Sequence, residues 1–193
     1  MKILYKKVDE RLKEIECVSN EDLEGLSKIE VVSEYVISLT GDITPLALQK
    51  ILYYVQGLFW AFVKDYIFDE DCQAWAHGPV YGDIYHKYKD YRYEPIDKCE
   101  VSTDAFESVL NGEEIEIVNS LVRNFGRYSG KMLEEITHFE TPWREARGNL
   151  KKLDRSNQVI DKNNIREYFE EVIKSYKMIN ILDIKDYSRK MLL

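Results

Sequence analysis

A Thr-Pro dipeptide followed by a long apolar repeat constrains this chain more than any other feature. The Thr44 hydroxyl can accept a hydrogen bond from a free backbone N–H, and Pro45 suits the first position of a helix. Over 45–64, apolar residues then recur at intervals of three and four, at Leu48, Ile51, Leu52, Val55, Leu58, Phe59, Phe62 and Val63. This segment therefore predicts the central helix of the core.

The same periodicity predicts further helices along the chain. They are expected at about 26–39 (ending at Gly41), 80–90, 104–110, 113–125, 130–136 after Ser129, 141–147 and 162–181. Residues 66–76 are expected to be extended or irregular, with a short strand at 66–68 or 73–75. The pattern predicts a mainly α protein: a single compact helical domain with at most a short two-stranded element.

Three regions are distinguished by this pattern. The charge-rich residues 1–25 are predicted to form a helical N-terminal extension. Residues 26–182 are predicted to form the helical domain, and residues 183–193 a C-terminal tail.

The composition indicates a soluble globular protein and narrows its partners. Hydrophobic residues make up 45% and charged residues 32% of the 193 residues, and the net charge is −8. An acidic surface repels phosphate backbones, which disfavours direct nucleic-acid binding but suits a basic protein partner. Cys17, Cys72 and Cys99 are odd in number and widely spaced, so a disulfide framework is disfavoured and a cytoplasmic location is expected. The longest apolar run, 58–63, is shorter than the roughly 20 residues that span a membrane, so no membrane partner is expected.

Motifs for catalysis or cofactor binding are absent from the sequence. It contains no glycine-rich phosphate loop, no HExxH, no paired CxxC and no GxSxG. Two alternatives remain open: a metal-binding set of His77, His138 and Glu140, and a nucleophile pair of Cys72 with His77. The simpler interpretation is that both histidines hydrogen-bond loop backbone. The sequence therefore predicts no catalytic residue, no cofactor and no metal.

A tyrosine-rich segment offers a candidate surface. Tyrosines at 81, 85, 88, 91 and 93 alternate with lysine, arginine and acidic residues, so the local charge is close to zero. Such a segment fits a half-buried helix face, a protein interface or, less well given the acidic balance, a nucleic-acid platform. The candidate partner contacts are Tyr81, Tyr85, Tyr88 and Arg92.

Three segments, in order, resemble the signature motifs of one family. They are ITPLALQKILYYVQG at 43–57, AWAHGPV at 74–80 and LEEITHFETPWREAR at 133–147. Their order and spacing resemble those of the Panacea antitoxin domain, whose members are also described as GepA-like phage-associated proteins. The resemblance extends over about 26–169, and one position departs from it, since Ala47 stands where a long polar residue is more frequent.

The resemblance implies a non-catalytic helical domain that neutralises a toxin by direct contact. Similar domains accompany very different toxins, among them toxic small alarmone synthetase-like enzymes that act on nucleotides or tRNA. The partner implied is a cognate protein toxin, and such an enzyme is one option. An alternative function is a proteolytic adaptor that delivers the toxin for degradation, with the termini as tethers.

The motif residues themselves are expected to serve mainly as scaffold. Gly78 permits an unusual turn, Pro79 fixes the chain direction, and Trp75 and Trp143 can anchor loops to the core. The expected scaffold residues are Thr44, Pro45, Gln49, Lys50, Tyr53, Trp75, Gly78, Pro79, Val80, His138, Pro142 and Trp143.

Overall fold

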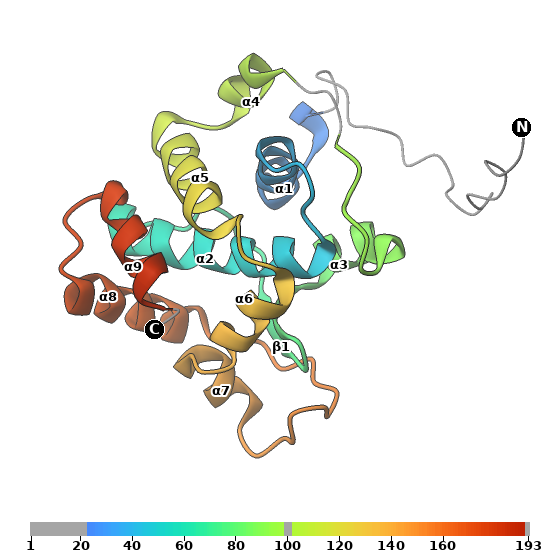
Figure 1. Ribbon diagram of the computed structural model, residues 1–193, viewed down its shortest axis with the longest axis vertical. Coiled ribbons are helices and arrows are strands. Elements are labelled where there is room, and N and C mark those ends of the chain that lie inside the picture. The colour runs from blue at the N-terminus through green and yellow to red at the C-terminus, as the bar shows by residue number, and fades with distance from the viewer. Residues whose placement is uncertain (1–22, 99–101, 192–193) are drawn as a thin grey trace, which may run out of the picture.

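Helix α2 (Pro45–Val63) is the centre of the fold in the computed structural model, which describes residues 23–98 and 102–191. The Thr44 hydroxyl accepts a hydrogen bond from the backbone N–H of Ala47 (3.3 Å), and Lys64 ends the helix in the left-handed conformation. Fifteen of its 19 residues are buried, because other elements cover it on several sides (Figure 1). The predicted core helix is confirmed.

The other helices arrange themselves around α2. Helices α1 (Lys28–Leu39), α5 (Gly112–Phe125), α6 (Gly130–Thr137) and α8 (Lys162–Tyr176) all pack directly against it. Figure 1 shows α1 and α5 on one side of α2 and α6 with the β-strands on the other. The shorter elements are η1 (Leu23–Gly25), α3 (Gly82–Tyr88), η2 (Lys89–Tyr91), α4 (Thr103–Val109), α7 (Thr141–Arg147), η3 (Ile181–Asp183) and α9 (Ile184–Lys190).

One antiparallel hairpin accompanies the helices. Strands β1 (Cys72–Trp75) and β2 (Gly78–Tyr81) pair Cys72 with Tyr81 and Trp75 with Gly78. On its other edge β1 exchanges backbone hydrogen bonds with the segment before α8, since Ala74 donates to Gln158 and Ile160 donates to Cys72. A mainly α fold with one short two-stranded element is therefore confirmed.

Several predicted boundaries are wrong. The helix expected at 80–90 begins only at Gly82, because Val80 and Tyr81 belong to β2. Of the two alternative strand positions, 73–75 forms as part of β1 and 66–68 does not. Thr40 rather than Gly41 caps α1. Helix α8 ends at Tyr176, because Lys177 adopts a left-handed conformation (φ 53°).

The structure describes the two predicted terminal segments only in part. Most of the predicted N-terminal extension, residues 1–22, lies outside the described residues, and Leu23 is buried against the domain. Part of the predicted C-terminal tail forms α9, which packs on α5 and buries Ile184 and Tyr187.

Helix α2 is also the only helix in the described part of the chain that is long and apolar enough to cross a membrane. However, 78% of its most apolar stretch is buried inside the structure. Its apolar character is accounted for by its position in the core.

A close approach between α2 and α8 depends on Gly57. A β-carbon at this position would lie 2.1 Å from Cδ2 of Phe169, whose ring is fully buried and packs edge-on against Tyr53 and Tyr54. Alanine would gain about 1 kcal/mol in helix propensity, but overpacking a filled core costs about 1–3 kcal/mol and here opposes a rigid ring. The steric cost of the added methyl group is therefore expected to exceed the gain in helix propensity.

We expect Gly57→Ala to lower the free energy of unfolding, measured by urea denaturation followed by circular dichroism. The matched control is Gly112→Ala at the start of α5, where an added β-carbon meets nothing within 4 Å and stability should be unchanged or slightly higher. Equal stability of Gly57→Ala and the wild type would show that α8 can shift away from α2.

Candidate functional site

Two glutamines on α2 bind the backbone of extended segments. Gln49 accepts a hydrogen bond from the Tyr81 N–H (2.7 Å) and donates one to the Tyr81 carbonyl (3.3 Å). Two turns further on, Gln56 accepts from the Ile67 N–H (3.1 Å) and donates to the Phe68 carbonyl (2.6 Å). Each side-chain amide thus forms hydrogen bonds with one backbone N–H and one backbone carbonyl, as a neighbouring strand would. The first motif is in this way fastened to the segments on either side of the second.

Lys50 links these two motifs directly. Its side chain is fully buried, and Nζ donates a hydrogen bond to the Pro79 carbonyl at 2.8 Å. Burial lowers the pKa of Lys50 to about 7, although Cys72 and Glu134 oppose the shift. Gly78 has a φ of 98°, and a β-carbon there would lie 2.7 Å from Cε of Lys50. The Gly-Pro pair therefore makes room for the lysine and presents the carbonyl that it binds.

Glu140 connects the third motif to α2. Its buried carboxyl accepts a hydrogen bond from the Tyr54 hydroxyl at 2.8 Å. Burial raises the pKa of Glu140 to about 7, and the nearby hydroxyls of Tyr54, Tyr53 and Tyr168 only partly oppose this. Glu140 is the residue before the first residue of α7, yet its side chain makes no cap and turns to α2 instead.

The third motif also holds the hairpin. The indole Nε1 of Trp143 donates to the Trp75 carbonyl (2.9 Å), and the guanidinium of Arg147 donates to the Ala74 carbonyl (3.2 Å). Arg147 also binds the carbonyls of Lys151 and Asp154 (2.6 and 3.0 Å), so one buried cation orders the loop after α7. All three motifs thus meet in one buried polar cluster around α2.

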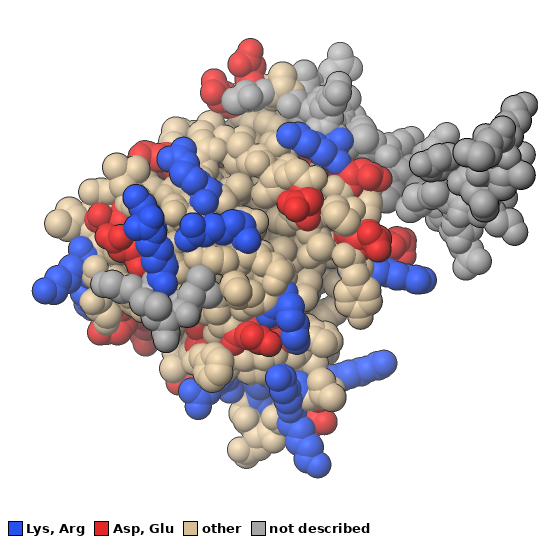
Figure 2. All heavy atoms as spheres, in the orientation of Figure 1, with Lys and Arg blue, Asp and Glu red and all other residues tan. Residues whose placement is uncertain are grey.

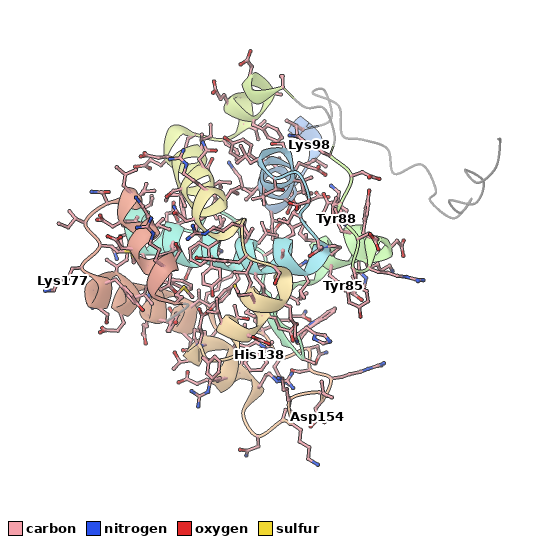
Figure 3. All side chains as sticks on the ribbon, in the orientation of Figure 1. Tyr85, Tyr88, Lys98, His138, Asp154 and Lys177 are labelled. Atoms are coloured by element: carbon pink, nitrogen blue, oxygen red, sulfur yellow. The ribbon has the colours of Figure 1, made fainter. Side chains whose placement is uncertain are left out.

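The expected scaffold residues lie in or beside this cluster. Of the twelve, only Thr44, Trp75 and His138 are partly exposed, and the other nine are buried. The two tryptophans differ: Trp143 is 7% exposed, whereas Trp75 is half-buried and its indole Nε1 donates to Gln73, two residues away. His138 stacks on Trp143 with ring centroids 4.2 Å apart, between α6 and α7 (Figure 3).

The structure removes two of the four predicted partner contacts. Tyr81 is 1% exposed and packs against Phe68, and Tyr88 is 3% exposed with its hydroxyl bonded to Glu34 (2.6 Å). Both were named as candidate contacts on one helical segment, but Tyr81 lies in β2 and Tyr88 faces the core side of α3 (Figure 3). Tyr85 is partly exposed and Arg92 is exposed, so these two remain accessible.

The alternative catalytic and metal sets are not assembled. His77 lies 3.2 Å from Glu134, His138 stacks on Trp143, and Glu140 bonds Tyr54. Within residues 23–98 and 102–191, no three His, Cys, Asp or Glu side chains are placed to hold a metal ion. Cys72 is buried in β1, and burial raises the pKa of its thiol to about 12, which keeps it protonated at neutral pH.

A surface feature that the sequence did not indicate is a groove beside α6. It has a volume of about 520 Å³ and is lined by Met132, Glu135, Ile136, Phe139, Glu140, Tyr168, Val172, Tyr176, Tyr187 and Met191. Phe139 is 80% exposed and Met132 40% exposed. Met132 and Ile136 lie one turn apart on α6 and Phe139 follows in the turn after it, and the spacing of these residues alone cannot show that they face solvent.

These features define a mainly helical domain in which three sequence motifs close one buried polar cluster, with a largely apolar groove on its surface. The family model "Antitoxin SocA-like, Panacea domain" matches residues 48–144, just over half of the chain. The chain belongs to this family of antitoxin-like domains. Neither a curated protein nor a solved structure matches it.

Proposed function

We propose that this chain is the antitoxin of a toxin–antitoxin pair and neutralises its cognate protein toxin by binding it directly. The observation that carries the proposal is membership of the antitoxin SocA-like family. The positions of the polar motif residues support binding rather than catalysis. Lys50 and Arg147 are buried and donate hydrogen bonds to backbone carbonyls, and the buried Glu140 accepts one from Tyr54, so all three have structural roles.

The charge of the chain supports a basic partner. With a net charge of −8, the protein attracts a toxin whose active or substrate-binding surface carries lysine and arginine for nucleotide or RNA phosphates. Acidic side chains can occupy such a surface in place of the phosphates. The charge is not uniform, because Lys and Arg side chains gather over α5 and α9 on the face in Figure 2. The partner is therefore expected to contact acidic or apolar parts of the surface rather than these basic side chains.

Purified toxin is expected to lose activity in proportion to added antitoxin and to be fully inhibited near one equivalent, with no protease present. Direct occlusion requires only the complex, so the end point reports stoichiometry. The measurement is a titration of toxin activity at a toxin concentration well above the dissociation constant. Full toxin activity at saturating antitoxin would contradict occlusion and favour the adaptor.

The adaptor alternative can be tested with the same assay. Its tethers were expected at the two ends of the chain, but α9 packs on α5, which leaves little of the C-terminal segment available. An N-terminal deletion should stop before Leu23, which is 1% exposed and belongs to the core. If deletion of residues 1–21 preserves inhibition in the purified titration, an N-terminal tether is not required.

A further inference from the structure

One wall of the groove beside α6 is apolar and includes an exposed aromatic residue. Met132, Ile136 and Phe139 form its wall on the α6 side, and Phe139 leaves 80% of its surface in water. Helices α8 and α9 form the opposite side, with Val172 and Tyr187 among the lining residues. Exposed apolar groups gathered along a groove indicate a protein contact, and aromatic anchors contribute strongly to such contacts.

The floor of the groove contains buried polar groups. Glu140 and Tyr187 are 3% and 2% exposed, and both line the groove. Oε1 of Glu140 is bound by Tyr54, whereas Oε2 of Glu140 and the hydroxyl of Tyr187 make no hydrogen bond of regular geometry with the described residues, although the Tyr168 hydroxyl lies near both and the Tyr53 hydroxyl lies near Glu140. Buried polar atoms are nearly always hydrogen-bonded, so Oε2 of Glu140 keeps the capacity to accept a hydrogen bond from a donor that enters the groove.

The charge of the groove shows what kind of donor would fit. Its charged lining residues are two carboxylic acids, Glu135 and Glu140, and no lysine or arginine is among the described residues that line it. A lysine or arginine side chain can donate hydrogen bonds to a carboxylate and pair with its charge, which makes such bonds about twice as strong as neutral ones. Because burial raises the pKa of Glu140 to about 7, an arriving cation would also favour its ionised form.

We propose that this groove binds an apolar segment of the partner protein that carries one lysine or arginine, with the apolar side chains against Phe139 and the cation at Glu140. This inference rests on the proposed function, since the partner is the toxin. A second copy of this chain fits less well, because a two-fold contact would bring like-charged Glu135 and Glu140 pairs together. Nucleic acid would meet carboxylates and no cation in the groove.

The first test replaces the aromatic residue of this wall, Phe139. The probe is the toxin encoded next to this chain, identified by relief of its toxicity on co-expression, and the dissociation constant is measured by calorimetry. Phe139→Asp is expected to weaken binding at least about 30-fold, as loss of a central anchor does. Because Phe139 is 80% exposed, the melting temperature should not change. The matched control is Leu153→Asp, a residue 76% exposed in the loop after α7, which should bind within about threefold of wild type.

The second test addresses the cation. Glu140→Gln keeps the size of the side chain and an oxygen for the Tyr54 hydroxyl, but it removes the charge. We expect about tenfold weaker binding to the toxin, as for loss of a charged hydrogen bond. In a double-mutant cycle, replacing the toxin's paired lysine or arginine by methionine should cost little further affinity in the Glu140→Gln background. Additive losses for every lysine and arginine in the toxin would overturn the proposed pairing.

The outcomes separate this inference from the proposed function. If wild-type protein neither binds nor inhibits the toxin, the proposed function fails and the groove assignment fails with it. If wild type inhibits but Phe139→Asp inhibits equally well, the groove proposal is overturned while the antitoxin function stands. Loss of binding with Arg92→Glu and Tyr85→Ala instead would place the interface on α3. A Phe139→Asp variant that only converts a dimer to a monomer would assign the groove to self-association.

Discussion

Replacing Trp143 by alanine is expected to lower the free energy of unfolding by about 3–5 kcal/mol, the usual cost of truncating a large buried aromatic residue. Trp143 is 7% exposed, its Nε1 donates to the Trp75 carbonyl at 2.9 Å, and its ring stacks on His138. The Arg147 guanidinium also lies 5.1 Å from its ring centroid. Truncation would remove one of the side-chain hydrogen bonds that join α7 to β1, and neutralisation should be lost as a consequence of unfolding.

The measurement is urea denaturation followed by circular dichroism, with the melting temperature as a second readout. Trp143→Phe should lose about 1–2 kcal/mol, because it keeps a buried ring but leaves the Trp75 carbonyl without its donor. Trp75→Ala is the matched comparison within the same motif pair and should cost less than Trp143→Ala. Trp75 is half-buried, and its Nε1 bonds Gln73 rather than a distant element.

A different result would change the role assigned to Trp143. If Trp143→Ala unfolds at the same urea concentration as wild type yet no longer binds the toxin, the residue belongs to the interface. The scaffold interpretation of the third motif would then be wrong, and the binding surface would extend from the α6 groove onto α7.

Local signals were sufficient to predict most helices. The Thr44 hydroxyl caps α2, Ser129 caps α6 and Asp161 caps α8, each at a position that the residue type favours. The 3.6-residue repeat marks the buried face over the length of α2 and α8, because a long amphipathic segment averages out single exceptions.

Strand β2 could not be predicted in this way. Four residues, Gly78–Tyr81, are too few for periodicity to distinguish a strand from the first turn of a helix. A proline also argues against a strand, although Pro79 is tolerated here because β2 pairs on one side only, with β1. The contact of β1 with Gln158 and Ile160 joins residues more than 80 positions apart, and nothing in the local sequence indicates it.

The sequence motifs identified most residues of the buried polar cluster but not the contacts that these residues make. Sequence motifs named Lys50 and Trp143, yet a fully buried lysine is rare, so composition alone would place Lys50 on the surface. The tyrosines at 81 and 88 were named as candidate contacts and yet are buried, because spacing shows which residues share a face but not which way that face points. Phe139 was missed for the opposite reason: apolar residues at helical spacing normally indicate core.

The buried ionisable groups predict an unusual dependence of stability on pH. The pKa of Glu140 is raised by burial from 4.5 to about 7, so between these values the folded protein holds a proton that the unfolded chain has released. Stability from this group is complete below pH 4.5 and is lost as the pH rises to 7, by about 3 kcal/mol in total. The pKa of Lys50 is lowered from 10.5 to about 7, so its contribution is complete above pH 10.5 and is lost as the pH falls to 7.

Both contributions are therefore smallest near pH 7, and each can be isolated by a variant. The free energy of unfolding is measured from urea curves between pH 4.5 and 10. The difference between wild type and Glu140→Gln should fall by about 3 kcal/mol from pH 4.5 to 7 and stay constant above it, because glutamine does not titrate. The difference between wild type and Lys50→Met should instead be constant below pH 7 and rise above it.

Taking these differences cancels the groups that are common to both proteins. In the Glu140→Gln comparison, the lowered carboxyl pKa values of Glu30, Glu134, Glu170 and Asp183 contribute equally to wild type and variant, so they drop out. Glu140 is faced by tyrosines from α2, α8 and α9, whose pKa values are raised and which stay neutral over this range. A Glu140→Gln difference that is flat from pH 4.5 to 7 would mean that the carboxylate is already ionised and paired in the folded protein. It would also remove the reason to expect that an incoming lysine or arginine is needed at the floor of the α6 groove.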